Sequence, residues 1–320
     1  MPKAKKSIGK MGLELCGVLL SITYFKMVLR EKKPLSLFIL LILSIIWGSS
    51  FILMHEGLKV FTSLQLASFR LGIIGLIFLP FGILSLKKVE LKDMKWFAIA
   101  GLIGNFIPAF CFAHAQTYLQ SSTAGILNSL TPLFTLLSGL LIFKKKYNLI
   151  KLSGILIGLI GALTLILSKP GGGIESNIIY GVLILLATLL YGINVNIIEL
   201  KLSKYNPLYI AFISLTFLFV PSLFCMIYFD FPFGTMFSKT SLYATLCIMF
   251  LGIAGTGIGL ILFNRLIQIS NGLFASTVTY TMPIISSLWG IYFNENFGLI
   301  QILSLSLIFA GVLIVRKNNA

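Results

Sequence analysis

Residues Ser121–Lys146 read SSTAGILNSLTPLFTLLSGLLIFKKK, and this stretch decides the fold class of the whole chain. The 21 residues from Thr123 to Phe143 contain no charged side chain, and as a helix they are long enough to cross a bilayer core of about 30 Å. Pro132 lies in the middle of the stretch, where a membrane-spanning helix accepts proline more readily than a soluble helix does. The stretch therefore predicts a transmembrane helix, and the lysines that follow it mark the end that faces the cytoplasm.

The same pattern returns later in the chain, where Ser276–Phe293 reads STVTYTMPIISSLWGIYF. A shift of 151 positions superposes a series of prolines, glycines and alanines. The aligned pairs are Gly101 and Gly252, Gly104 and Gly255, Ala124 and Ala275, Pro132 and Pro283, and Gly139 and Gly290. The chain is therefore predicted to contain one membrane unit twice.

The composition is that of an integral membrane protein. Hydrophobic residues make up 58% of the 320 residues and charged residues only 11%, and the charges are bunched between apolar runs. The net charge of +16 would suit nucleic-acid binding, but the lysines flank apolar runs and do not interleave with aromatics on a polar surface, so no nucleic-acid partner is expected. Cys16, Cys111, Cys225 and Cys247 stand singly, without the spacing of a metal site or a disulfide framework, and no cofactor is expected.

The apolar runs predict an all-α membrane protein with ten transmembrane helices. The expected spans are 35–54, 64–84, 96–113, 122–143, 150–168, 178–198, 207–229, 242–263, 272–293 and 298–315. A glycine-rich segment divides five of these spans from the other five. We therefore predict a basic cytoplasmic leader over 1–34, a first five-helix repeat over 35–168, an outer linker over 169–177, a second five-helix repeat over 178–316 and a cytoplasmic tail over 317–320. The leader lies outside the repeat and is expected to be inessential.

The basic residues are distributed unevenly over the two sides of the predicted membrane. With the N-terminus inside, the cytoplasmic segments hold most of the lysines and arginines, whereas the opposite side has only Lys59, Lys169 and Lys239. Both termini of this multi-pass protein are therefore predicted to face the cytoplasm, in the cell inner (cytoplasmic) membrane. Since each repeat has an odd number of spans, the two repeats are predicted to be inverted relative to each other, as in many secondary transporters.

Several short motifs follow one another in a characteristic order. They are Trp47-Gly48-Ser49-Ser50-Phe51, Arg70, the block ending at Pro132 and Gly154/Gly158/Gly161, with Tyr191-Gly192, Ala275, Pro283, Glu295 and Gly311 as second-half echoes. In this order the chain resembles the EamA-type members of the drug/metabolite transporter superfamily, over roughly residues 35–316. The resemblance implies two five-helix repeats and a carrier for a small organic metabolite or amino acid, with export favoured. Lys144 stands where the family pattern often has an acidic residue, which Glu295 supplies in the second half.

Polar side chains near the middle of spans are the candidates for substrate binding, because transport needs a polar cavity inside an apolar shell. Trp47 and Ser50 share a helix face, and Tyr191 and Asn194 repeat their spacing in the second half. The predicted substrate-binding residues are Trp47, Ser50, Asn105, Asn128, Thr131, Tyr191, Asn194, Thr277 and Tyr280. Ser, Thr and Asn also join membrane helices by hydrogen bonds, and for any single Ser or Thr this structural role is the favoured interpretation.

Arg70 is the only strong charge well inside a predicted span. It lies six residues from the outer start of that span at Leu64, so its side chain can either anchor at the outer interface or contact the substrate. Gly154 and Gly158 have the spacing that lets membrane helices approach closely, and they are predicted to serve packing.

The sequence argues against an enzyme. It contains only two histidines, His55 and His114, and no Asp or Glu is centred in any predicted span, so no catalytic constellation can be assembled from it. The favoured function is a polytopic secondary transporter. A flippase for a lipid-linked substrate and a channel-like or sensory membrane scaffold are the alternatives. The expected partners are a small-molecule substrate and the lipid bilayer, and a homodimer stays open.

Overall fold

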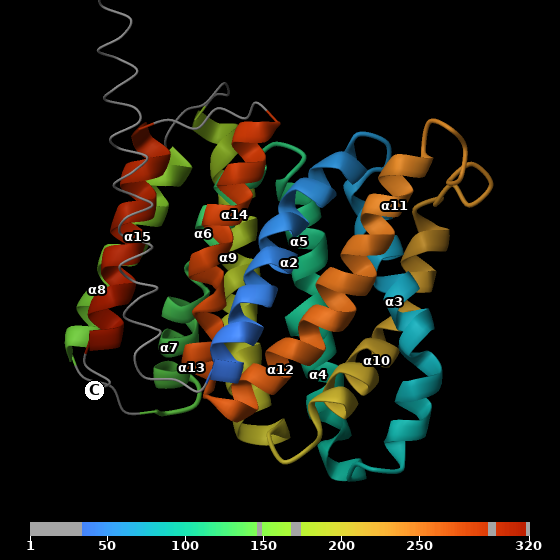
Figure 1. Ribbon diagram of the computed structural model, residues 1–320, viewed down its shortest axis with the longest axis horizontal. Helices are drawn as coiled ribbons and strands as arrows, with labels where there is room; N and C mark the ends of the chain where they lie inside the picture. The colour runs from blue at the N-terminus through green and yellow to red at the C-terminus, as the bar shows by residue number, and fades with distance from the viewer. Residues whose placement is uncertain (1–33, 146–148, 168–173, 294–298, 318–320) are drawn as a thin grey trace, which may run out of the picture.

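The computed structural model describes residues 34–145, 149–167, 174–293 and 299–317, and the regular elements in these ranges are all helices (Figure 1). The first half contains α2 (Pro34–Leu58), α3 (Ser63–Leu86), η1 (Leu91–Asp93), α4 (Met94–Gly101), η2 (Leu102–Phe106), α5 (Ile107–Ala115), α6 (Ser121–Asn128), α7 (Thr131–Leu141) and α8 (Leu149–Leu167). The second half contains α9 (Ile174–Ile197), η3 (Ile198–Leu202), α10 (Pro207–Tyr228), α11 (Leu242–Phe250), η4 (Leu251–Ile258), α12 (Gly259–Ile269), α13 (Gly272–Ser276), α14 (Val278–Tyr292) and α15 (Leu299–Lys317). The predicted leader, apart from its last residue, and most of the predicted linker lie outside the described residues.

Seven helical segments in the described part of the chain are long and apolar enough to cross a membrane. They are Pro34–Leu58, Ser63–Leu86, Leu91–Ala115, Ser121–Leu141, Ile178–Leu202, Pro207–Tyr228 and Leu242–Ile269. The other three predicted spans, near 150–168, 272–293 and 298–315, are also helical, but they fall outside this set. The all-α membrane fold is therefore confirmed, whereas the count of ten spans is not.

The two halves pack together through matching pairs of helices. α3 packs along α10 at one side of the molecule, and α8 packs along α15 at the other (Figure 1). α2 of the first half contacts α14 of the second, and α9 of the second half contacts α7 of the first. Across the repeat α3 corresponds to α10, α8 to α15, α2 to α9 and α7 to α14. Exchanging the two halves therefore leaves the first two contacts unchanged and converts the α2–α14 contact into the α9–α7 contact. The contacts therefore have the two-fold arrangement expected of a duplicated unit.

Glycines allow α8 and α15 to approach each other closely. A Cβ atom at Gly311 would collide with the backbone oxygen of Gly154 and would lie 2.6 Å from the backbone nitrogen of Gly158. Any side chain at position 311 would push the two helices apart. The prediction that Gly154 and Gly158 serve packing is confirmed.

The third long helical segment of each half is interrupted by a π-helical turn at the same place. η2 contains Gly104 and η4 contains Gly255, which are the two glycines that the repeat aligns. Such turns inside α-helices are frequent at functional sites. The sequence repeat predicts the paired glycines, but it does not predict the change in helix type.

The sequence predicts a single helix over Thr123–Phe143, but the structure has two helices there. α6 ends at Asn128 and α7 begins at Thr131, so Pro132 lies in the first turn of α7, where its missing N–H leaves no helical hydrogen bond unmade. Thr131 Oγ1 donates to the carbonyl oxygen of Asn128 at 2.7 Å and satisfies a backbone group that the break leaves open. In the second half the break comes earlier, at Thr277, and Pro283 lies inside α14. The two prolines therefore align in sequence but differ in their place in the helix.

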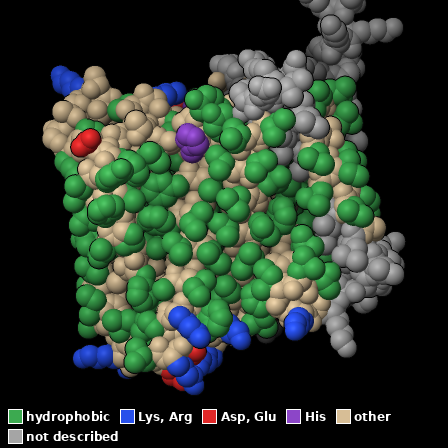
Figure 2. Space-filling view, turned by 180° about the vertical axis from the view of Figure 1, so that it is seen from behind, with side chains coloured by type: hydrophobic (Ala, Val, Ile, Leu, Met, Phe, Trp, Pro, Cys, Tyr) green, Lys and Arg blue, Asp and Glu red, His purple; other side chains and the backbone are tan. Residues whose placement is uncertain are grey.

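Most basic side chains of the described residues gather at one end of the molecule, which we call the lysine-rich end and which is the lower edge in Figure 2. The described basic side chains at this end are Lys87, Lys88, Lys92, Lys95, Lys144, Lys145, Lys201, Lys204 and Arg265. The opposite end has Lys59 and Lys239 among the described residues. α2 begins at the lysine-rich end and α9 runs toward it, so the first helices of the two halves point in opposite directions (Figure 1). Hydrophobic side chains cover the middle of the face seen in Figure 2.

Ion pairs connect the loops at the lysine-rich end. Lys204 pairs with Asp93 at 2.7 Å and with Glu90 at 2.6 Å, and so ties the chain before α10 to the loop after α3. The hydrogen bonds to Asp93 and Glu90 raise the pKa of Lys204, and the bonds from Lys204 and Lys92 lower the pKa of Glu90. All of these groups are therefore charged around neutral pH, the condition under which the ion pairs between the loops form.

Candidate functional site

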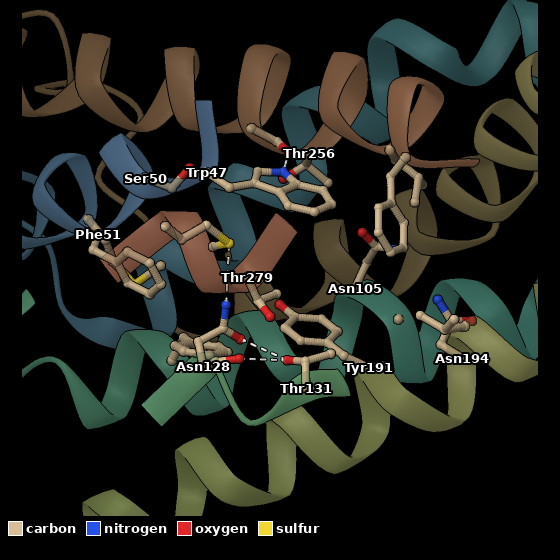
Figure 3. A pocket seen from close by; sticks show the side chains of 18 of the residues that line it. Trp47, Ser50, Phe51, Asn105, Asn128, Thr131, Tyr191, Asn194, Thr256 and Thr279 are labelled. Atoms are coloured by element: carbon tan, nitrogen blue, oxygen red, sulfur yellow. Dashed lines mark hydrogen bonds between the residues drawn. The ribbon is translucent and has the colours of Figure 1, made fainter. Parts of the chain in front are cut away.

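A cavity of about 110 Å³ lies between the two halves, near the middle of the helices (Figure 3). The first half contributes Trp47, Ser50, Phe51, Met54, Arg70, Gly104, Asn105, Phe112, Asn128 and Thr131 to its wall. The second half contributes Tyr191, Asn194, Val195, Gly255, Thr256, Leu260, Phe263, Thr279 and Met282. The wall therefore combines aromatic and aliphatic side chains with a small number of polar groups, which is the usual make-up of a small-molecule site.

α2 and α9 present equivalent side chains to this cavity. Trp47 on α2 donates from Nε1 to the carbonyl oxygen of Gly255 at 2.7 Å, and its ring packs against Phe263 with 5.1 Å between centroids. Tyr191 on α9 stacks on Phe112, with 6.0 Å between centroids and 19° between the ring planes. Each aromatic ring is therefore held by the third long helical segment of the other half.

The π-helical turns confirm which residues correspond across the repeat. A Cβ atom at Gly104 in η2 would collide with the side-chain amide of Asn194 on α9. A Cβ atom at Gly255 in η4 would lie 3.1 Å from Ser50 Oγ on α2. Since Gly104 and Gly255 are aligned by the repeat, Asn194 is the structural counterpart of Ser50. The two-fold relation predicted from their spacing is therefore present in the packing.

The break between α6 and α7 carries two of the predicted residues into the cavity wall. Asn128 ends α6, and its side-chain Nδ2 donates to the sulfur of Met282 at 3.6 Å. Thr131 begins α7 and bonds back to Asn128, as the dashed lines in Figure 3 show. In this view Asn128, Thr131 and Tyr191 lie on one side of the cavity, and Trp47 and Ser50 lie on the other. The polar pair is thus exposed to the cavity because the helix is interrupted there.

Two amide groups at the cavity have side-chain atoms without a partner in the described part of the chain. They are Nδ2 of Asn105, which is a donor, and Oδ1 of Asn194, which is an acceptor. The Asn194 side chain is buried, with 5% of its surface exposed. Buried polar atoms are ordinarily hydrogen-bonded, so such atoms at a cavity are suited to contact water or a ligand.

Arg70 also lines the cavity, although it was not among the predicted binding residues. Its Nε donates to Thr256 Oγ1 in η4 at 2.9 Å. The structure places Arg70 in the cavity wall. Contact with the substrate, one of the two alternatives that the sequence leaves open, stays a prediction. The sequence shows that Arg70 lies well inside its predicted span, but this position alone does not reveal which way the side chain turns.

Two predicted residues lie outside this wall. Tyr280 is buried with its ring 6.0 Å from that of Phe309 on α15, and Thr277 Oγ1 donates to the carbonyl oxygen of Phe274 at 2.6 Å. Their neighbour Thr279 lines the cavity instead. The reason is the break at Thr277, which sets the faces of α14 independently of the preceding residues. Sequence spacing alone does not reveal that break.

The histidines lie away from the cavity wall. His114 Nδ1 is 3.3 Å from Ser63 Oγ, at the end opposite the lysines, and its ring lies near that of Tyr180. His55, near the end of α2, is half-buried. Neither residue is among those that the structure describes around the cavity.

The fold and the site together define a class of protein: a multi-pass helical membrane protein built from two related halves, with a cavity lined partly by polar side chains where the halves meet. The model of the EamA-like transporter family matches residues 34–167 and again residues 178–317. The chain therefore belongs to the EamA-like transporter family, and the predicted resemblance is confirmed.

Several relatives are similar over most of their length. An uncharacterized transporter of Archaeoglobus fulgidus is 25% identical over 275 residues, which are 85% of this chain and 95% of the relative. The uncharacterized transporter YdfC of Bacillus subtilis is 28% identical over 266 residues, 76% of this chain and 79% of the relative. A solved crystal structure shares the fold with a TM-score of 0.58 at 15% identity, covering 90% of this chain and 98% of that one.

Proposed function

We propose that this protein is a secondary carrier that moves a small organic metabolite or amino acid across the cytoplasmic membrane, with export as the favoured direction. The observation that carries the proposal is the central cavity, whose wall takes polar side chains from corresponding positions of both halves. In carriers made of inverted repeats the substrate site lies at such a place, and rocking of one half against the other exposes it to each side in turn. The names of the relatives as transporters support the same class.

The proposed arrangement in the membrane has ten spans in two inverted five-helix repeats, with both termini in the cytoplasm. Three observations support it. The basic side chains gather at one end, in accordance with the positive-inside rule (Figure 2). α2 and α9 run in opposite directions (Figure 1). The segments near 150–168, 272–293 and 298–315 are helical, as three further spans require.

The orientation predicts which positions can be labelled from outside the cell. In a variant without the native cysteines, Gly172→Cys is expected to react with a membrane-impermeant maleimide in intact cells, whereas Lys145→Cys is not, because Lys145 lies at the lysine-rich end. Labelling after lysis, where both positions should react, is the control for accessibility. Outside labelling of Lys145→Cys together with protection of Gly172→Cys would contradict the orientation.

Transport is expected to need no proton. None of the acidic side chains that the structure describes lines the cavity, and Glu56 and Glu199 form ion pairs at helix ends, with Lys59 at 2.6 Å and Lys145 at 3.1 Å. A carboxylate that exchanges protons in a carrier has to lie in the path of the substrate. Substrate counterflow in proteoliposomes should therefore proceed without a pH gradient and should leave the internal pH unchanged. Strict dependence on an imposed gradient, abolished by Glu199→Gln or His114→Ala, would refute this expectation.

The transport proposal itself is tested by comparing the metabolites inside and outside cells. Cells that produce the protein are expected to accumulate at least one small organic compound in the medium, relative to cells without it. A second strain producing an equal amount of the Tyr191→Leu variant serves as the control, because that substitution changes the cavity wall. Identical metabolite profiles in all three strains, under several nutrient conditions, would count against a metabolite carrier.

A further inference from the structure

The charge of the cavity wall is carried by one residue. Of the residues that the structure describes around the cavity, Arg70 alone is charged. An arginine has five N–H donors, and the bond from Nε to Thr256 Oγ1 uses only one of them. No acidic side chain in the described part of the chain forms an ion pair with Arg70. The cavity therefore holds a cation without a protein counter-charge.

An unpaired charge at this depth is costly, so it needs a reason. The duplicated fold indicates that the reason is not packing. Gly252 approaches the backbone oxygen of Arg70 so closely that a Cβ would lie 2.8 Å from it, and Gly101 approaches the backbone oxygen of Ser214 in the same way, at 2.5 Å. Because Gly101 and Gly252 are aligned by the repeat, Ser214 is the counterpart of Arg70. The second half makes the equivalent helix contact with a serine, so the fold does not require an arginine.

The remaining wall and the volume limit what the cavity can hold. A single water needs roughly 10–15 Å³ of such space, so a cavity of about 110 Å³ has room for roughly seven to eleven non-hydrogen atoms. Trp47, Phe112 and Tyr191 offer aromatic surfaces to an apolar body. The free donor of Asn105 and the free acceptor of Asn194 add one polar contact of each kind.

We propose that the cavity selects a small carboxylic acid in its ionised form, with the Arg70 guanidinium binding the carboxylate. The planar fork of a guanidinium matches the two oxygens of a carboxylate, and such charge-assisted pairs are the strongest hydrogen bonds that proteins make. A single arginine neutralises one negative charge, whereas a phosphate monoester carries about −1.5 to −2 at pH 7, so the carboxylate is the better match. This assignment rests on the proposed carrier function, since it names the substrate class of the same cavity.

The test compares compounds of one shape and different charge. Binding of benzoate, benzamide and benzylamine, and of isovalerate, isovaleramide and isoamylamine, is measured on the purified full chain in detergent, by titration of the thermal unfolding temperature. At least one acid is expected to bind about ten-fold or more tightly than its amide, because a hydrogen bond to a charged group is lost in the amide, and the amines should not bind. Phenyl phosphate is included as the competing anion.

Two arginine variants connect the preference to the residue. Arg70→Met is expected to abolish the difference in affinity between acid and amide, because it removes the guanidinium from the cavity wall. Arg265→Met is the matched control, because Arg265 is an exposed arginine at the lysine-rich end, away from the cavity wall, and its loss should leave the preference intact. If Arg70→Met fails to accumulate, the series of acids, amides and amines on the unaltered protein decides the question alone.

The proposal is overturned if no acid of the series binds, if the amides or amines bind as tightly as the acids, if phenyl phosphate binds more tightly than benzoate, or if Arg70→Met keeps the acid preference. Counterflow of the bound acid in proteoliposomes separates this proposal from the carrier function. Acid-selective binding without counterflow would refute the carrier function but support the proposed carboxylate site. Counterflow without a preference for acids would support the carrier function but refute the proposed carboxylate site.

Discussion

Replacing Tyr191 by leucine is expected to lower the rate of transport at least about ten-fold without lowering the amount of protein in the membrane. Leucine keeps an apolar side chain at this position of α9, but it removes the hydroxyl group from the cavity wall and the ring that stacks on Phe112 at 6.0 Å. A buried polar contact to the substrate is worth about 1–3 kcal/mol, or roughly 5- to 150-fold in rate, and the loss of the aromatic ring adds to it. Initial rates of counterflow, normalised to the amount of carrier, are the measurement.

Tyr191→Phe is the control that separates the hydroxyl from the ring. It keeps the stacking on Phe112 and removes only the oxygen, so its rate should lie between those of the unaltered protein and Tyr191→Leu. If Tyr191→Leu instead accumulates poorly while the carriers that reach the membrane work at the full rate, Tyr191 is a packing residue. The same comparison can be made on its counterpart, with Trp47→Phe, which removes the donor to the carbonyl of Gly255.

The largest effect on stability is expected from Gly192→Ala. A Cβ atom at this position of α9 would lie 2.6 Å from the backbone carbon of Phe134 and 2.6 Å from the backbone nitrogen of Thr135 on α7. Backbone cannot move aside as a flexible side chain does, so α9 and α7 must separate, at a cost of about 1–3 kcal/mol or more. The separation also weakens the bond at 2.8 Å from Asn196 Nδ2 to the carbonyl oxygen of Thr135. The unfolding temperature in detergent should therefore fall by several degrees.

Gly234→Ala is the matched control for this prediction. No atom outside its immediate neighbourhood lies within 4 Å of a Cβ added at Gly234, so the same chemical change meets open space there. Its unfolding temperature is expected to equal that of the unaltered protein. Equal unfolding temperatures for Gly192→Ala and Gly234→Ala would show that α9 and α7 are not held as closely as the structure has them.

The cavity-lining residues on α2 and α9 could be predicted because their signal is local. A helix places Trp47 and Ser50 on one face, and lipid leaves few places for polar side chains other than the interior between helices. Because the repeat places Tyr191 and Asn194 at the corresponding positions, the same orientation toward the cavity is predicted for them. Both pairs line the cavity, since a long unbroken helix preserves the spacing that the sequence shows.

The prediction located Asn128 and Thr131 beside the break after α6, but it missed the part of the wall that follows the break at Thr277, and it missed Arg70. Thr279 lines the cavity in place of Tyr280, because the break at Thr277 sets the face of α14. Arg70 turns toward Thr256 and not toward the outer surface, because η4 packs against α3 and offers a hydrogen-bond acceptor there. Both outcomes depend on neighbours that are distant in sequence.

The sequence by itself determined that this chain is helical, membrane-spanning and duplicated, because apolar length, lysine placement and internal repeats belong to the linear order of residues. Only the tertiary structure decided which atoms face the cavity. A π-helical turn adds a residue to one turn of helix and so rotates everything after it by about 100° around the helix axis. The turns η2 and η4 reset the helix faces in this way, and at the breaks after Asn128 and at Thr277 a new helix begins with its own set of faces. These turns and breaks depend on how the two halves pack against each other, so no periodicity in the sequence marks them.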